Sequence, residues 1–114
     1  MPTFDRQKAL DQIDGDRETL SLLVSTLDRA SPAQFQAMSQ AIDDADGQKL
    51  AAAAHCLKGS LGVFAAESAV ALTRRIEQCA REEDFVAAKE TLSELEREYA
   101  ELQAELAIFV NSSE

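Results

Sequence analysis

The stretch Ala51-Ala52-Ala53-Ala54-His55-Cys56-Leu57-Lys58-Gly59-Ser60-Leu61-Gly62-Val63-Phe64 decides the fold of this chain. It holds the only histidine and two of the four glycines. At about 100° per residue on an α-helix, its larger apolar side chains recur every three or four positions and form one stripe. The stripe consists of Leu50, Ala54, Leu57, Leu61 and Phe64. Such a stripe has to face a core.

A second face of the same predicted helix lies roughly 130° from the stripe and carries almost no side-chain bulk. It consists of Gln48, Ala51, His55, Lys58, Gly59 and Gly62. Glycine inside a helix costs about 1 kcal/mol relative to alanine, so two glycines on one exposed face need a reason. We expect a partner surface to approach this face closely at His55.

The composition indicates the fold class. The chain has 114 residues, of which 46% are hydrophobic, and this is enough for one domain with its own core. Four glycines, two prolines and abundant Ala, Leu, Glu and Gln favour helix. We therefore expect an all-α protein with a single domain over residues 1–114.

Charge and cysteine content argue against several kinds of partner. Twenty-one acidic and eleven basic residues give a net charge of −10, and no basic stripe is present to bind nucleic acid. No apolar run is long enough to cross a membrane, and no signal peptide opens the sequence. Cys56 and Cys79 lack the spacing of metal ligands, and two free thiols suit a reducing compartment. We expect no metal site, no membrane contact and a cytoplasmic location.

Three helices are predicted before the central stretch. Residues 3–15 form a short helix that ends at the Asp14-Gly15 turn, and Asp16 caps the next helix. We expect this second helix to stop before Ser31-Pro32, because Ser31, Pro32 and Gln34 match a capping box. The apolar positions of the second and third helices are Leu20, Leu23, Val24, Leu27, Phe35, Met38, Ile42 and Ala45.

Three further helices complete the chain. Asp46 is the expected N-cap of the helix with His55, which runs to about Phe64. A short break near Ala65-Ala66 leads to a fifth helix, and Asp84 caps the last one. Their apolar stripes are Ala69, Leu72, Ile76 and Cys79, and then Leu92, Leu95, Tyr99, Leu102, Leu106 and Phe109.

These elements predict an antiparallel four-helix bundle over residues 16–110, with one or two short additional helices at the N-terminus. The last stripe repeats at intervals of three and four, which is the period of left-handed helix packing. Residues 111–114 are expected to fray.

The face around His55 suits phosphoryl transfer. A neutral imidazole attacks phosphorus near physiological pH without a general base. Transfer also needs a cation for the phosphoryl oxygens and room for the other active site. Lys58 and Gly59 supply both within one helical turn of His55. A lone histidine on a helix is usually structural or solvated, but this combination on one face favours a site.

Other catalytic arrangements have little support. Cys56 points about 100° away from His55, so the two do not form a nucleophilic pair. No nucleotide-binding or kinase motif is present. An enzyme that used His55 as a general base would find no second catalytic group on this face except Lys58.

At His55-Cys56-Leu57-Lys58-Gly59-Ser60 the sequence resembles the histidine-containing phosphotransfer (HPt) domains of bacterial multistep phosphorelays. Their pattern is H-x-L-K-G-S, then a small apolar stretch and Gly-Ala, and the resemblance covers nearly the whole chain. Two positions depart from it: Ala65 replaces the glycine, and the bulky Leu61 replaces a small residue. Neither lies on the face of His55.

The resemblance implies that His55 accepts a phosphoryl group from the aspartate of a response-regulator receiver domain and passes it to another receiver aspartate. By the same resemblance, Lys58 would contact the phosphoryl group and Gly59 would give the partner's active site room to approach. The geometry of the helix face adds Gln48, Ala51 and Gly62 to the expected docking surface. The chain would then be a carrier, not an enzyme, and would need no cofactor of its own, because Mg²⁺ is bound by the receiver.

Two further expectations concern partners. A hybrid sensor histidine kinase, in cis or in trans, could also exchange phosphate with the chain, and the charged exterior of a closed bundle suggests a monomer. The alternative is a helical adaptor that docks receiver domains without being phosphorylated, although His55 and Lys58 argue against it.

Overall fold

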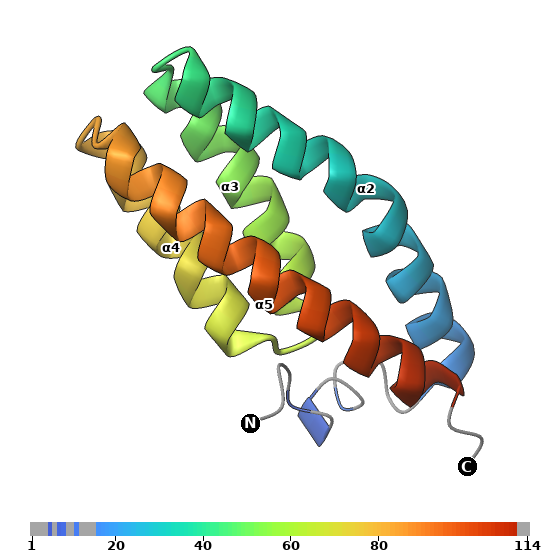
Figure 1. The fold of residues 1–114 in the computed structure, drawn as a ribbon. Helices are drawn as coiled ribbons and strands as arrows, with labels where there is room; N and C mark the ends of the chain where they lie inside the picture. Colours follow the sequence, from blue (N-terminus) through green and yellow to red (C-terminus); the bar gives the residue numbers. More distant parts are fainter. Residues whose placement is uncertain (1–4, 6, 9–10, 12–15, 112–114) are drawn as a thin grey trace.

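The computed structural model describes residues 5, 7–8, 11 and 16–111. In these ranges the chain forms helices and no strand. The helices are α2 (Arg17–Asp43), α3 (Gly47–Gly62), α4 (Glu67–Arg81) and α5 (Phe85–Asn111). They form an elongated bundle in which α3 packs between α2 and α4, and α5 contacts α4 and α2 (Figure 1). The predicted antiparallel four-helix bundle is confirmed.

The N-terminal segment is tied to the turn between α3 and α4. The amide of Asp5 donates to the carbonyl of Ala65 at 3.2 Å, and Lys8 pairs with Glu67 at 3.1 Å. Residues 7, 8 and 11 are helical. The rest of the predicted helix 3–15, like residues 112–114 of the predicted tail, lies outside the described residues.

The predicted break before Ser31-Pro32 is wrong, because α2 continues through both residues. The Ser31 hydroxyl is not a cap: the residue is 1% exposed, and its oxygen lies 2.5 Å from the hydroxyl of Tyr99 in α5. Pro32 removes one hydrogen bond from the helix interior. Burial of Leu27 and Met38 on either side of it offsets that loss.

The predicted N-caps are confirmed. The carboxylates of Asp16, Asp46 and Asp84 each accept hydrogen bonds from backbone amides two or three residues further on. These bonds satisfy amides that a helix leaves unpaired in its first turn, so they fix where α2, α3 and α5 begin.

The end of α3 differs slightly from the expectation. The helix ends at Gly62 rather than Phe64, and the chain turns at Ala65, which has a φ of 54°. A left-handed alanine costs roughly 1–2 kcal/mol, which glycine would avoid. The replacement of the HPt glycine by Ala65 therefore affects the conformational energy of this turn.

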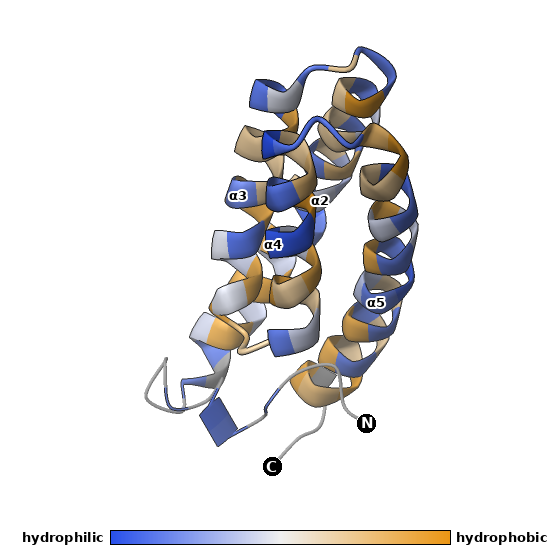
Figure 2. Ribbon diagram, turned by 90° about the vertical axis from the view of Figure 1, so that its left-hand side faces the viewer, coloured by the Kyte–Doolittle hydropathy of each residue, from blue (hydrophilic) through white to orange (hydrophobic). Residues whose placement is uncertain are grey.

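The predicted stripes of α3 and α5 form the core. Each of the five stripe residues of α3 is at most 2% exposed, and each of the six of α5 at most 6%. Figure 2 shows the hydrophobic side of α5 turned toward the other helices and its hydrophilic side turned outward. Burial of these stripes fixes the rotation of α3 about its axis, and hence the direction in which His55 points.

Seven predicted core positions need correction. Four of them lie on α2 and are only partly buried: Leu23, Val24, Phe35 and Ile42. On α4 the buried positions are 69, 73, 76 and 80, so Leu72 and Cys79 are only partly buried. Thr73 takes a core position because its hydroxyl donates to the carbonyl of Val70 at 2.6 Å. Ala45 is exposed, since it lies in the turn after α2 with a φ of 52°.

Candidate functional site

His55 stands on the outward side of α3, opposite its buried stripe. Its side chain is 72% exposed, whereas Leu57 and Leu61 on the same helix are fully buried. One turn further on, Lys58 is half-buried, with 25% of its side chain exposed. The structure therefore brings the two predicted chemical groups together on the surface beside α4.

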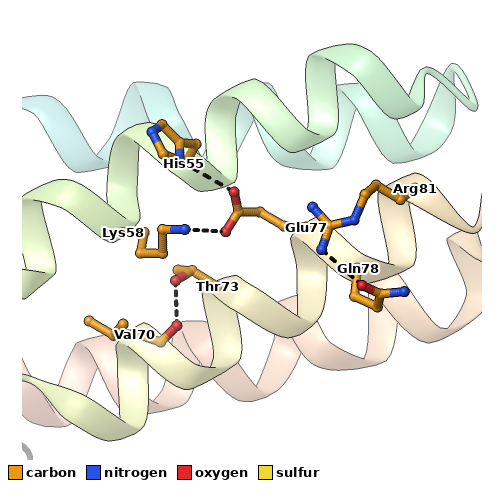
Figure 3. A network of polar contacts seen from close by, with 7 residues as sticks. All are labelled: His55, Lys58, Val70, Thr73, Glu77, Gln78 and Arg81. Atoms are coloured by element: carbon orange, nitrogen blue, oxygen red, sulfur yellow. Dashed lines mark hydrogen bonds and ion pairs between the residues drawn. The ribbon is translucent and has the colours of Figure 1, made fainter.

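A carboxylate from α4 joins these two side chains. Glu77 Oε1 lies 2.7 Å from Lys58 Nζ, and Glu77 Oε2 lies 3.3 Å from His55 Nδ1. Figure 3 shows Glu77 reaching across from α4 between the two residues of α3. Only 12% of the Glu77 side chain is exposed, so its two hydrogen bonds hold it in one place.

The charges of α3 keep Glu77 ionised. Partial burial pushes the pKa of Glu77 upward, but the hydrogen bond and charge of Lys58, aided by His55, outweigh burial and hold the pKa below its usual value. A carboxylate at this position orients the imidazole. With the proton on Nδ1, the ring donates to Glu77, and Nε2 keeps the lone pair of a nucleophile.

Sequence reasoning missed Glu77. It is one of 21 acidic residues, and nothing in its neighbourhood distinguishes it. It follows the buried Ile76, at the edge of the apolar stripe of α4. Only the packing of α4 against α3 shows which carboxylate reaches His55.

The two glycines on the face of His55 are not required by packing inside the molecule. A Cβ added to Gly59 or to Gly62 would meet no atom within 4 Å. Gly59 is exposed four residues after His55. The space above it is therefore open to another molecule.

The remaining predicted surface residues extend along α3. Gln48 is exposed and Ala51 half-buried, and both line a hollow with Arg81 of α4. Gly62, at the other end, lines a second hollow with Arg74. The six residues predicted for this face thus follow one edge of α3, and His55 is at its middle.

The described residues contain no group of three or more His, Cys, Asp or Glu side chains placed to hold a metal ion. None of the described helices has the length and apolarity needed to cross a membrane.

Comparison with known proteins gives a family and a fold. The family model of the Hpt domain matches residues 21–105. A solved structure, that of histidine-containing phosphotransfer protein B (HptB) from Pseudomonas aeruginosa PAO1, superimposes with a TM-score of 0.89. Its sequence is 19% identical, and the match covers 99% of this chain and 98% of that one. No curated protein sequence matches significantly.

Proposed function

This chain belongs to the Hpt domain family, and from that premise we propose that His55 is the residue that carries its phosphoryl group. The family assigns the chain a histidine phosphotransfer role in phosphorelays, with receiver domains as its partners. His55 is the only histidine of the sequence. Because this family carries its phosphoryl group on a histidine, no other residue of the chain is a candidate for the phosphorylated position.

The observation that carries the assignment is the geometry of the ring. His55 is exposed, and its Nδ1 faces the Glu77 carboxylate. The Nε2 lone pair forms the bond to phosphorus, and the bond between phosphorus and the aspartyl oxygen breaks with its electron pair going to the aspartate. Nδ1 keeps its proton throughout. The same steps in reverse return the phosphoryl group to a second aspartate.

Lys58 and the glycines support this reaction. Lys58 Nζ lies one turn from the ring and can turn from Glu77 toward a phosphoryl oxygen. Gly59, with Gln48, Ala51 and Gly62, forms the low surface on which the receiver docks. The adaptor alternative has no observation in its favour, since a docking surface alone needs neither the imidazole nor the ammonium.

The finer expectations from the sequence belong to the same proposal. The chain acts as a monomeric carrier without kinase activity or cofactor, and Mg²⁺ is held by the receiver. A hybrid sensor kinase, in cis or in trans, is a further source of phosphate in this proposal. The two free thiols, Cys56 and Cys79, favour a cytoplasmic setting.

The test is transfer from a purified receiver domain that has been phosphorylated by a small-molecule acyl phosphate. The wild type should gain acid-labile phosphate, and His55→Gln should gain none. The variant should still bind the receiver and melt at the wild-type temperature, because position 55 is exposed. If the wild type bound several receivers but gained no phosphate from any of them, the adaptor function would replace the proposed one.

A further inference from the structure

Cations gather at one end of the face that His55 occupies. Arg74 of α4 and Lys8 of the N-terminal segment line a hollow of about 520 Å³ beside Gly62. We name this the Arg74 hollow; its other lining residues are Ala65, Ala66, Glu67 and Val70. Arg74 is exposed and makes no ion pair within the described part of the chain. Lys8 pairs with Glu67, but both side chains are more than half exposed, and such pairs hold weakly.

The opposite end of the same face is acidic. The hollow beside Gln48 and Ala51 is lined by Asp44, Asp46 and Glu83, with Arg81 as its one basic residue. The face therefore changes sign along α3, from negative near Gln48 to positive near Gly62, and His55 lies between. This polarity contrasts with the whole chain, whose net charge is −10.

Arg74 is within reach of a molecule that covers His55. It lies three residues before Glu77, so the two share one side of α4 about one turn apart. Glu77 in turn contacts His55. Gly62 follows His55 by seven residues, which is about 10 Å along α3. A partner centred on His55 covers the Arg74 hollow as well.

The partner arrives with negative charge. A phosphoryl group carries about −1.5 to −2 charges at neutral pH, and Mg²⁺ that accompanies a phosphoryl group in a protein is usually bound through one or two carboxylates. The overall field of a chain at −10 repels such a surface. A local cluster of cations beside the acceptor is what can attract it and set its orientation.

We propose that the Arg74 hollow is the electrostatic anchor for the partner receiver, and that it takes acidic side chains from the rim of the receiver's active site while His55 enters. The inference rests on the proposed function of His55. Arg74 acts on encounter and not on the transfer step. Substitution of Arg74 should therefore lower the second-order rate constant of transfer, measured at low receiver concentration, and leave the maximal rate unchanged.

The neighbouring arginine gives a matched control. Arg75 points about 100° away from Arg74 and pairs with Glu94 of α5 at 3.6 Å. Arg74→Glu and Arg75→Glu change the net charge equally, from −10 to −12, but only the first alters the hollow. Transfer from a phosphorylated receiver domain would be followed for both variants and for wild type, at low salt and in about 1 M salt, where screening acts over about 3 Å.

We expect Arg74→Glu to lower the second-order rate by about tenfold at low salt, with an unchanged maximal rate and a much smaller difference in high salt. Arg75→Glu should stay within about twofold of wild type. Equal losses in both variants, or no loss in either, would overturn the anchor while wild-type labelling still supported His55. Absence of label on wild type would instead refute the proposed function and the anchor with it. Thermal melts of both variants check that neither result comes from unfolding.

Discussion

The two ends of α3 hold glycines for different reasons. At the N-terminal end, a Cβ on Gly47 would lie 2.7 Å from the carbonyl oxygen of Ala80 in α4, so the fold itself excludes a side chain there. Toward the other end, a Cβ on Gly59 would meet nothing within 4 Å. One glycine lets two helices of this chain approach, and the other leaves space for a different molecule. The comparison separates a residue that the fold requires from one that we propose to serve docking.

The largest expected effect is on phosphoryl transfer, at Gly59, where the surface of α3 is open. Gly59→Lys places a long side chain where the receiver has to approach, and we expect the second-order rate of transfer to fall about 100-fold, since a misplacement of about 1 Å has effects of that size. Thermal stability should not fall, because the new side chain points to solvent. The rate is measured with a phosphorylated receiver domain.

Gly59→Ala is the matched control for this variant. A methyl group leaves most of the space open, so transfer should stay near the wild-type rate, and the helix should gain about 1 kcal/mol of unfolding free energy. Normal transfer in Gly59→Lys would show that clearance at this position is not needed.

Substitution of Gly47, where α3 packs closely against α4, should show the reverse pattern: a loss of stability and an unchanged transfer rate. Gly47→Ala drives a Cβ against backbone, and overpacking of this kind destabilises by about 1–3 kcal/mol. Urea denaturation followed by circular dichroism measures the loss. The fraction that remains folded should transfer phosphate at the wild-type rate. A stable Gly47→Ala would mean that α3 and α4 can separate at this point without loss.

Lys58 lies between the two ends. We expect its substitution to affect both stability and transfer, with the smallest change of the variants considered. Because the pKa of Glu77 is below its ordinary value of 4.5, the folded state gains stability above pH 4.5, and the gain disappears as the pH falls through the lower folded value. Lys58→Ala should remove about 1 kcal/mol near pH 7 and slow transfer about tenfold.

The pH dependence distinguishes this ion pair from a packing contact. The stability difference between Lys58→Ala and wild type should shrink as the pH is lowered below 4.5, because a protonated Glu77 no longer pairs with Lys58. Urea unfolding at a series of acid pH values measures it. A difference that stays constant with pH would show that Lys58 stabilises the fold through its methylene groups.

Much of the fold could be predicted from local patterns. The stripe of α3 is buried as the spacing indicated, and Asp46 caps that helix as its position indicated. Both depend on residues that are neighbours along the chain, so one sequence is enough to reveal them. The same holds for the face of His55, which is the complement of the buried stripe on one helix.

The error at Ser31-Pro32 arose because distant residues decide. Ser31 and Pro32 have the local signature of a helix start, yet a bond from Ser31 to Tyr99, 68 residues away, and burial on both sides keep α2 continuous. Packing outweighs local propensity there. The error at Thr73 has a local cause, because its hydroxyl donates to a backbone carbonyl of its own helix and a polar residue can then take a core position.

By itself, the sequence determined the four-helix architecture, the outward direction of His55 and the low surface around it, because periodicity and capping act within a few residues. The tertiary structure alone decided which carboxylate meets His55 and Lys58, which of two adjacent arginines lies beside Gly62, and which glycine the fold requires. These facts depend on how α4 lies against α3. That arrangement is set by the burial of the whole core, and the spacing of residues along either helix does not reveal it.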